Sequence, residues 1–373
     1  MARSKIKVGV IGVGNCFSGL YQGLEYYRHH NVDRAAGLMH PVLGGYKLTD
    51  IEFASAFDVA LSKVGSHLHN ATFASPNSVN WIRAMPKSGV VVQESPILDG
   101  IGTFVHGMVK PVKNKPLDVL TQDIRRHIEE SGTRILLCYL PVGSQKACEY
   151  WAKMALDTGC GMVNCLPVFI ASNSLWAQRF KQAGLPIAGD DIKAQVGSTI
   201  VHRTLAKLVD DRGALIASTY QLNVGGNTDF LNMREHSRLS SKKISKTESV
   251  QSNLRKPLDA DRIHIGPSDY VPFLGNKKLG FMRIEGRMWA DVPFNIELRL
   301  EADDKANSGG VSVDALRCVQ IALDRGVGGY LEGPSAYFMK HPPVQHADPV
   351  ARQMVEDFIA GKESAPAVKN KAK

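Results

Sequence analysis

Residues 6–19 read Ile6-Lys7-Val8-Gly9-Val10-Ile11-Gly12-Val13-Gly14-Asn15-Cys16-Phe17-Ser18-Gly19. An apolar strand, a glycine turn and a helical pattern follow one another here, as in a dinucleotide-binding βα unit. Gly12 permits the tight turn, Gly14 lets the backbone approach a pyrophosphate, and the helix N-terminus supplies free N–H groups. Phe17 stands where the fingerprint has glycine or alanine, so a strand–helix turn without a ligand is the alternative.

The second strand of this unit is predicted at residues 53–57, directly before Asp58. An acidic residue at the end of that strand bonds the ribose 2′-hydroxyl and selects NAD over NADP. Asp58 lies 46 residues after Gly12, beyond the usual spacing, and an irregular insertion between them explains the difference. A helix N-cap is the other role open to Asp58.

Further alternation of strands and helices predicts a parallel sheet in the first half of the chain. Strands are expected at residues 90–92, 135–140 and 162–165, with an amphipathic helix over about 144–156. After residue 213 strand-like segments dominate, at 215–224, 262–265, 279–284 and 294–300. The last alternates apolar and charged residues, which is typical of a half-solvated antiparallel strand. Helical patterns return after Gly309-Gly310 and over about 349–360.

These patterns predict an α/β fold in which a Rossmann-like NAD-binding domain contains an inserted α+β domain with a mixed sheet. The expected boundaries are residues 1–199 for the NAD-binding domain and 200–311 for the insertion. Residues 312–361 are expected to form helices that return to the first domain, and residues 362–373 a flexible basic tail.

Composition narrows the functional class. Apolar residues make up 44% and charged residues 22% of the 373 residues, as in ordinary globular enzymes. No apolar run approaches the ~20 residues of a membrane span, and the strand beginning at Ile6 leaves no room for a signal peptide, so we expect a cytoplasmic protein that binds no membrane.

Cysteines and net charge exclude further classes. The six cysteines form no Cys-x-x-Cys pair, which predicts reduced, mostly buried thiols and no zinc site. The net charge of +9 suits an anionic ligand. No helix-turn-helix or RNP-like motif supports nucleic-acid binding.

Several polar segments place lysines or carboxylates beside glycines and small residues. Lysine clusters are usually solvated faces, and that is the alternative for each of them. The segments are Gly189-Asp190-Asp191-Ile192-Lys193, Gly225-Gly226-Asn227-Thr228-Asp229, Ser241-Lys242-Lys243-Ile244-Ser245-Lys246, Gly275-Asn276-Lys277-Lys278-Leu279-Gly280, Asp304-Lys305-Ala306-Asn307-Ser308-Gly309-Gly310 and Phe338-Met339-Lys340-His341-Pro342-Pro343.

With the Gly-x-Gly-Asn-Cys turn, residues 37–40 (Gly-Leu-Met-His) and residues 99–102 (Asp-Gly-Ile-Gly), these segments resemble the myo-inositol-1-phosphate synthases, especially their bacterial and archaeal branch. The resemblance covers most of the chain, up to about residue 362. It implies a Rossmann-like domain completed by the C-terminal helices, and a middle α+β domain that carries the active site and the contacts of a homotetramer.

The resemblance also implies the site residues. The catalytic set is Lys242, Lys246, Lys278, Lys340, Asp304, Asp191 and Asn227, with Asp229 nearby. The cofactor-binding set is Gly12, Gly14, Asn15, Cys16, Asp58, Asp190 and Gly226. Which aspartate of the pair 190–191 matters stays open, as does the choice between the adjacent lysines 277 and 278. The cofactor is NAD, with a divalent or monovalent cation as a further candidate, and no metal ligands are assigned.

The implied reaction is the isomerisation of glucose 6-phosphate to 1D-myo-inositol 3-phosphate. It proceeds by oxidation at C5, loss of a proton from C6, attack on the C1 aldehyde and reduction at C5. Clustered ammonium groups lower one another's pKa, so one lysine can act as a base while the others stabilise negative charge. Lys340 or Lys242 is expected to exchange the C5 hydroxyl proton, Lys278 to polarise the C5 oxygen, and Lys246 to hold the phosphate or the C1 oxygen. Asp304 would bind a cation or orient a lysine.

Residues 231–252 are expected to order over the substrate and exclude water, and an exposed flexible loop is the alternative. Two other functions stay open: an NAD-dependent sugar-phosphate dehydrogenase that releases NADH, and a non-catalytic NAD-binding regulator. A related synthase acting on another sugar phosphate is a further alternative.

Overall fold

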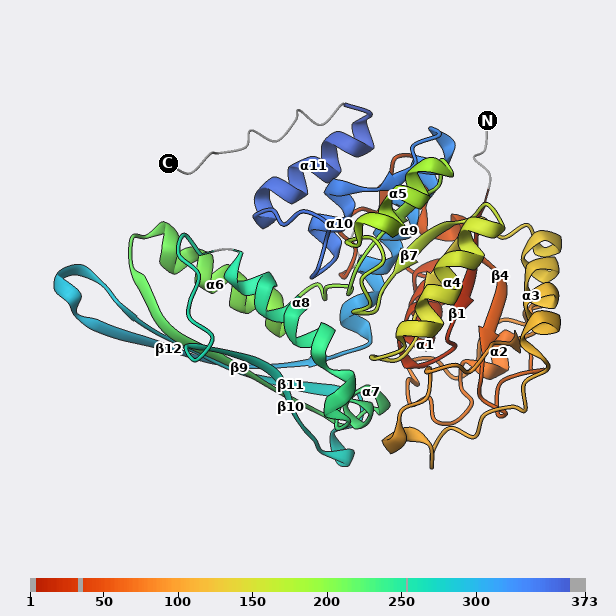
Figure 1. Cartoon of the computed structure of the whole chain (residues 1–373), viewed down its shortest axis with the longest axis horizontal. Helices are drawn as coiled ribbons and strands as arrows, with labels where there is room; N and C mark the ends of the chain where they lie inside the picture. The colour runs from red at the N-terminus through yellow and green to blue at the C-terminus, as the bar shows by residue number, and fades with distance from the viewer. Residues whose placement is uncertain (1–4, 33–35, 253, 363–373) are drawn as a thin grey trace.

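The computed structural model describes residues 5–32, 36–252 and 254–362, which form two main β-sheets (Figure 1). The larger sheet has seven strands in the order β13-β8-β7-β6-β1-β4-β5, and all its pairings are parallel. This confirms the predicted α/β class. The strands are β1 (Ile6–Ile11), β4 (Ile51–Asp58), β5 (Gln93–Glu94), β6 (Ile135–Cys138), β7 (Gly161–Asn164), β8 (Pro186–Ala188) and β13 (Gly329–Tyr330).

Helices cover both faces of the parallel sheet, so its strands are apolar on both sides. Ile6, Val8 and Val10 of β1 pack in one apolar cluster with α1 (Asn15–Arg28), α9 (Ala306–Asp324), α10 (Glu332–Phe338) and α11 (Asp348–Ala360). Ile11 faces the other cluster, with α3 (Leu117–Ser131), α4 (Gln145–Asp157) and α5 (Ser174–Gln182). The two clusters make the sheet a rigid layer whose strand ends can position a site.

The predicted strand at residues 90–92 is wrong. Its backbone turns toward the loop before α2 (Leu68–Ala71): Val92 donates to Ser66, Leu68 donates to Val90, and Val91 forms an isolated antiparallel bridge with His67. These bonds use the groups that a sheet strand needs, so the edge strand is the two-residue β5 instead. The irregular insertion before β4 contains a small hairpin of β2 (Val42–Leu43) and β3 (Tyr46–Lys47).

The second sheet is mixed, as predicted. Its order is β10-β9-β11-β12, with β10 and β9 parallel and the other pairs antiparallel. The strands are β9 (Leu215–Gly225), β10 (Ile263–Tyr270), β11 (Lys277–Arg287) and β12 (Pro293–Asp303). Met282 and Ile284 of β11 are buried beside the half-buried Leu298 and Ile296 of β12, which confirms the alternating antiparallel strand.

Three helices belong to this second sheet and its junction with the first. They are α6 (Ser198–Asp211), α7 (Thr228–Asn232) and α8 (Ser240–Gln251). In Figure 1, α6 and α8 lie together along one side of the sheet, and α8 packs against α6 and β10. The alternative of a flexible loop for residues 231–252 is therefore wrong for the described residues. Ser249 and Val250 are fully buried, because small side chains on α8 allow close packing against α6.

Helix α9 begins earlier than its sequence pattern indicated. α9 starts at Ala306 and includes Gly309 and Gly310, although glycine is a poor helix former. The reason is close packing: a Cβ at Gly310 would collide with the carbonyl oxygen of Gly37. α9 then crosses the parallel sheet and contacts β6, β7 and β8. The domain boundaries at residues 199, 311 and 361 stay predictions.

The cysteines and the apolar helices bear on two expectations drawn from composition. All six cysteines are free and five are buried, which confirms the expectation of mostly buried thiols. Within residues 5–32, 36–252 and 254–362, no helix is long and apolar enough to cross a membrane. The predicted basic tail falls almost entirely on residues 363–373, outside the described part of the chain.

Candidate functional site

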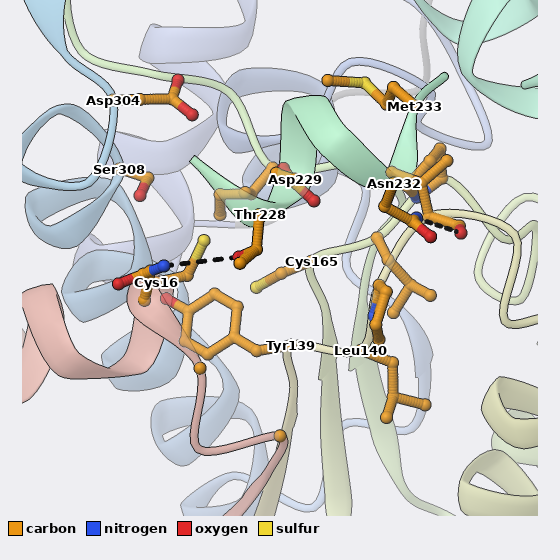
Figure 2. Close-up of a pocket in the computed structure, with 18 of the residues that line it drawn as sticks. Cys16, Tyr139, Leu140, Cys165, Thr228, Asp229, Asn232, Met233, Asp304 and Ser308 are labelled. Atoms are coloured by element: carbon orange, nitrogen blue, oxygen red, sulfur yellow. Dashed lines mark hydrogen bonds between the residues drawn. The ribbon is translucent and has the colours of Figure 1, made fainter. Parts of the chain in front are cut away.

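A cavity lies at the carboxyl edge of the parallel sheet, where it meets the second sheet. The ends of β1, β4, β6, β7 and β8 contribute one wall, and α7, α8, β11 and the start of α9 contribute the other. Figure 2 shows Tyr139 and Cys165 from the strand ends facing Thr228 and Asp229 of α7. The carboxyl edge is where ligands bind in open α/β sheets.

The glycine turn at this edge has the form that a dinucleotide requires. Gly12 has a φ of +89°, and a Cβ there would lie 2.8 Å from the carbonyl oxygen of Tyr139. Gly14 faces open space, with no atom within 4 Å of a built Cβ. It is the N-cap of α1 and supplies no side-chain cap, so the N–H groups of the first turn are available for a pyrophosphate. Asn15 and Cys16 line the cavity beside it.

Asp58 lines the same cavity and braces the turn. Its Oδ2 accepts from the backbone N–H of Val13 at 2.7 Å, and its Oδ1 accepts from Val59 and Ala60 at 2.8 Å each. Lys63 Nζ lies 3.8 Å from Oδ2 and donates to the Val13 carbonyl at 2.8 Å. The carboxylate is thus held rigidly at the end of β4, beside the glycine turn.

Asp191 joins two lysine-bearing segments of the site. Its Oδ1 accepts from Lys340 Nζ at 2.9 Å, and its Oδ2 accepts from Ser245 Oγ at 2.6 Å. Lys340 Nζ also donates to the Ile192 carbonyl at 2.6 Å. Ser245 precedes Lys246, which is 4% exposed and lines the cavity. One buried carboxylate therefore sets the position of Lys340 and anchors the helix that carries Lys246.

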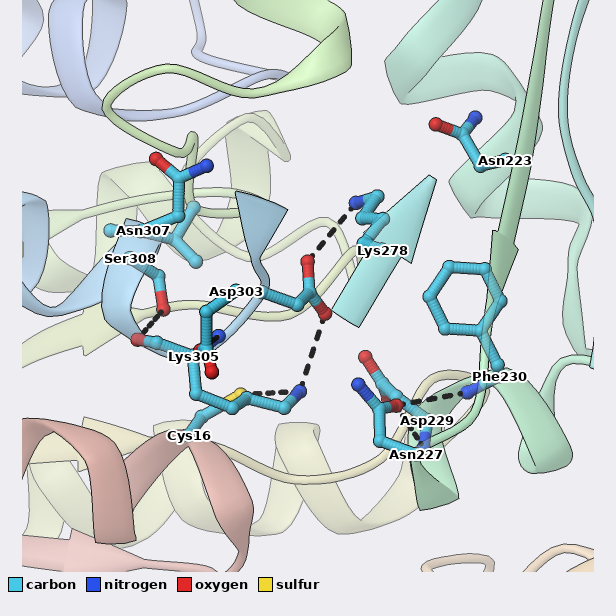
Figure 3. A network of polar contacts seen from close by, with 12 residues as sticks. Cys16, Asn223, Asn227, Asp229, Phe230, Lys278, Asp303, Lys305, Asn307 and Ser308 are labelled. Carbon is cyan, nitrogen blue, oxygen red and sulfur yellow. Dashed lines mark hydrogen bonds and ion pairs between the residues drawn. The ribbon is translucent and has the colours of Figure 1, made fainter. Parts of the chain in front are cut away.

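Asp304 forms a second carboxylate centre on the opposite wall. Its Oδ1 lies 3.1 Å from Lys278 Nζ and its Oδ2 lies 3.4 Å from Lys305 Nζ. Lys305 Nζ in turn lies 3.5 Å from Cys16 Sγ. In Figure 3, dashed lines run from Lys278 to an unlabelled carboxylate, which belongs to Asp304, from there to Lys305, and from Lys305 to Cys16 at the nucleotide turn. This chain of contacts links the turn to the lysine cluster.

Ten of the predicted site residues therefore meet in one cavity, and three other described ones, Asp190, Asn227 and Gly226, do not line it. Asp190 accepts from Asn164, Ile170, Ala171 and Ser172, and burial raises its pKa to about 6. Asn227 caps α7 through its side chain. Gly226 packs against the backbone of residues 271–275. The side chain of Lys242 lies outside the described part of the structure, although its backbone belongs to α8.

The cavity also contains residues that sequence reasoning passed over. Lys193 is 2% exposed, donates to the Ala336 carbonyl at 2.7 Å, and lies 3.3 Å from Asp348 Oδ1. Burial lowers the pKa of Lys193 to about 7. Lys305 is equally buried. Lys193 lies in the segment 189–193 and Lys305 in the segment 304–310. No local sequence pattern distinguishes a buried lysine from a solvated one.

A second helix N-terminus faces the cavity. α6 begins at Ser198 after Gly197, which gives no side-chain cap, and residues 197–200 line the cavity. Gly280 of β11 makes this approach possible, because a Cβ there would collide with Ser198 Oγ. The cavity thus contains two uncapped helix N-termini, α1 and α6, and lysines between them, which is an arrangement suited to a ligand pair with two phosphate centres.

The Rossmann-like sheet with this lysine-rich cavity defines the class: an α/β enzyme of the nucleotide-binding architecture. Residues 197–305 match the sequence model of the family Myo-inositol-1-phosphate synthase. The chain is 49% identical over 362 residues to the inositol-3-phosphate synthase of Mycolicibacterium smegmatis, covering 96% of this chain and 98% of that protein. It is 47% identical over 365 residues to the Corynebacterium glutamicum inositol-3-phosphate synthase, covering 96% and 99%. The chain belongs to the myo-inositol-1-phosphate synthase family, which confirms the resemblance.

The fold is shared more widely than the sequence. The crystal structure of inositol-3-phosphate synthase from Caenorhabditis elegans matches with a TM-score of 0.73 at 14% identity, covering 96% of this chain and 86% of that chain. At this identity the likeness concerns the fold alone.

Proposed function

We propose that this chain is an inositol-3-phosphate synthase, an isomerase that converts D-glucose 6-phosphate to 1D-myo-inositol 3-phosphate at the start of inositol biosynthesis. The observation that carries the proposal is the single cavity with two uncapped helix N-termini and lysines between them. The N-terminus of α1 would take a dinucleotide pyrophosphate, and that of α6 with Lys246 would take the phosphate of the sugar. The activity named for relatives 49% and 47% identical supports the same reaction.

NAD fits the turn at Gly12–Cys16 and would supply a hydride acceptor that is regenerated within each turnover. Lys340 or Lys242 would exchange the proton of the C5 hydroxyl, and Lys278 would stabilise negative charge on the C5 oxygen. Asp191 keeps the Lys340 ammonium in place at 2.9 Å. Asp304 orients Lys278 at 3.1 Å. Asp191 is buried and Lys278, Lys340 and Asp304 are half-buried, which would limit the access of water to the ketone that forms.

The test is the product made by purified protein from glucose 6-phosphate and NAD. The proposal expects inositol phosphate to accumulate, detected by phosphorus NMR, without net formation of NADH. NADH that rises in proportion to sugar consumed would instead identify a dehydrogenase. Binding of NAD without any turnover would identify a regulator.

NAD should bind at least about tenfold more tightly than NADP, which corresponds to ~1.4 kcal/mol. The reason is the Asp58 carboxylate, which three backbone N–H groups fix at the end of β4 and which would repel a 2′-phosphate. Isothermal titration calorimetry with both cofactors measures the difference. Equal affinities would remove Asp58 from the proposed role.

We further propose a homotetramer assembled through the second sheet. Its open face exposes Tyr220 and Phe281, each 37% exposed, and the tip of the β11–β12 hairpin exposes Trp289 at 92%. β12 is also an edge strand, and exposed edges and apolar faces usually need covering. Light scattering at micromolar concentration should give four times the mass of the chain. A monomeric mass would contradict the proposal.

A further inference from the structure

Lys305 places a positive charge where burial and helix geometry both oppose one. Its side chain is 2% exposed, and an ammonium removed from water costs several kcal/mol unless it is paired. It is also the N-cap of α9, where the positive end of the helix dipole disfavours a cation. A lysine retained at such a position needs negative partners close to its Nζ.

The surrounding groups supply those partners. Asp304 Oδ2 lies 3.4 Å from Lys305 Nζ, and Asp229 adds a second negative charge nearby. Burial lowers the pKa of Lys305, but the contact with the Cys16 sulfur and the charges of Asp304 and Asp229 outweigh it and keep the pKa above its ordinary value. The ammonium therefore remains protonated at neutral pH.

Charge in this part of the cavity balances between carboxylates and lysines. Asp304 and Asp229 face the ammonium groups of Lys278 and Lys305. Across the described ranges, no group of three or more His, Cys, Asp or Glu side chains is arranged to hold a metal ion. A free cation would need the Asp304 carboxylate as a ligand. The ammonium groups of Lys278 and Lys305 already contact that carboxylate and would repel the cation.

We propose that Lys305 is a built-in cation. Its ammonium occupies the position beside Asp304 that a free metal or ammonium ion would otherwise take, and so fixes the carboxylate that orients Lys278. Lys305 is then a positioning residue that acts through Asp304, and the protein needs no added monovalent or divalent cation. The expected effect on catalysis rests on the proposed synthase function. The replacement of a free cation by the Lys305 ammonium does not rest on it.

Two substitutions separate charge from volume. Lys305→Ala removes the ammonium and leaves space for a small cation, whereas Lys305→Met removes the charge and fills the space. We expect each to lower inositol phosphate formation by about 10²-fold or more, and ammonium or potassium chloride to restore at least about tenfold in the alanine variant alone. Lys277→Ala is the matched control, because the Lys277 side chain is 67% exposed and pairs with Glu301 on the surface; it should behave as the wild type.

A second readout needs neither NAD nor substrate. Ammonium or potassium should raise the thermal midpoint of Lys305→Ala above its value in tetramethylammonium chloride of equal ionic strength, since an ion bound only to the folded state stabilises it. The wild type and Lys305→Met should respond alike to all three salts. Wild-type turnover should also be unchanged by a chelator and by the choice of salt.

Three results would overturn the inference. One is wild-type turnover that requires potassium, ammonium or a metal ion removed by the chelator. Another is wild-type turnover in Lys305→Ala, or a thermal midpoint of Lys305→Ala that neither ammonium nor potassium raises. The third is a loss confined to NAD affinity without a cation response, which would assign Lys305 to the dinucleotide phosphates. A fourth result separates the two proposals. If the wild type makes no inositol phosphate, but ammonium or potassium still raises the thermal midpoint of Lys305→Ala, the synthase function is wrong and the role of Lys305 as a built-in cation is supported.

Discussion

Replacing Lys246, Lys278, Lys340 or Lys242 singly by alanine is expected to reduce turnover by about 10²–10³-fold, which corresponds to roughly 3–4 kcal/mol for one group that stabilises transition-state charge. Lys246, Lys278 and Lys340 line one cavity, so each can reach the same ligand. NAD binding and the thermal midpoint should change little. Initial rates of inositol phosphate formation measure the effect, with calorimetry for NAD.

The sequence offers a matched control for two of these lysines. Lys277 and Lys243 are adjacent to Lys278 and Lys242, and a solvated lysine changes stability by about 0.5 kcal/mol or less. The side chain of Lys277 points outward to Glu301, so Lys277→Ala should retain wild-type turnover. If Lys277→Ala and Lys243→Ala lose as much as their neighbours, the assignment of residues is wrong. If none of the six substitutions matters, the cluster is a solvated face and the synthase function fails.

The second large effect is expected from Asp191→Asn, which should lower turnover by about 10²-fold, the order expected when a reacting group is misplaced by about 1 Å. Asparagine keeps the shape of the side chain and is tolerated at the φ of +62° found there, as it is in other left-handed positions. It removes the negative charge that Lys340 Nζ contacts at 2.9 Å. Rates of product formation and the NAD dissociation constant should separate this loss from a binding defect.

The neighbouring aspartate provides the control for this substitution. Asp190 faces backbone and side-chain donors of residues 164–172 and does not line the cavity. Asp190→Asn would turn one acceptor into a donor among those groups, so we expect a loss of about 1–3 kcal/mol of stability, with turnover per folded molecule retained. Thermal unfolding measures this effect. The reverse pattern, with activity lost at residue 190 and kept at residue 191, would exchange the two roles.

The sequence by itself determined the layers of this protein. The apolar strands β1 and β6, which contain no charged residue except Lys7, alternate with helical patterns and so indicated a parallel sheet, and the alternation in β12 indicated a half-exposed strand. The Gly12–Gly14 turn was predictable because its conformation depends on residues adjacent in the chain. Residues 90–92 were predicted wrongly, because their bonding partners are in a loop that no local pattern specifies.

Only the tertiary structure decided which polar residues act together. Asp190 and Asp191 are indistinguishable by spacing, yet one is enclosed by loop donors and the other contacts Lys340, 149 residues away. Lys305 looks like any lysine at the start of a helix until the fold brings Cys16, 289 residues distant, within 3.5 Å of its Nζ. The physical reason is that the charge state and direction of a side chain depend on burial and on partners from distant segments, whereas periodicity reports only the neighbours along one strand or helix.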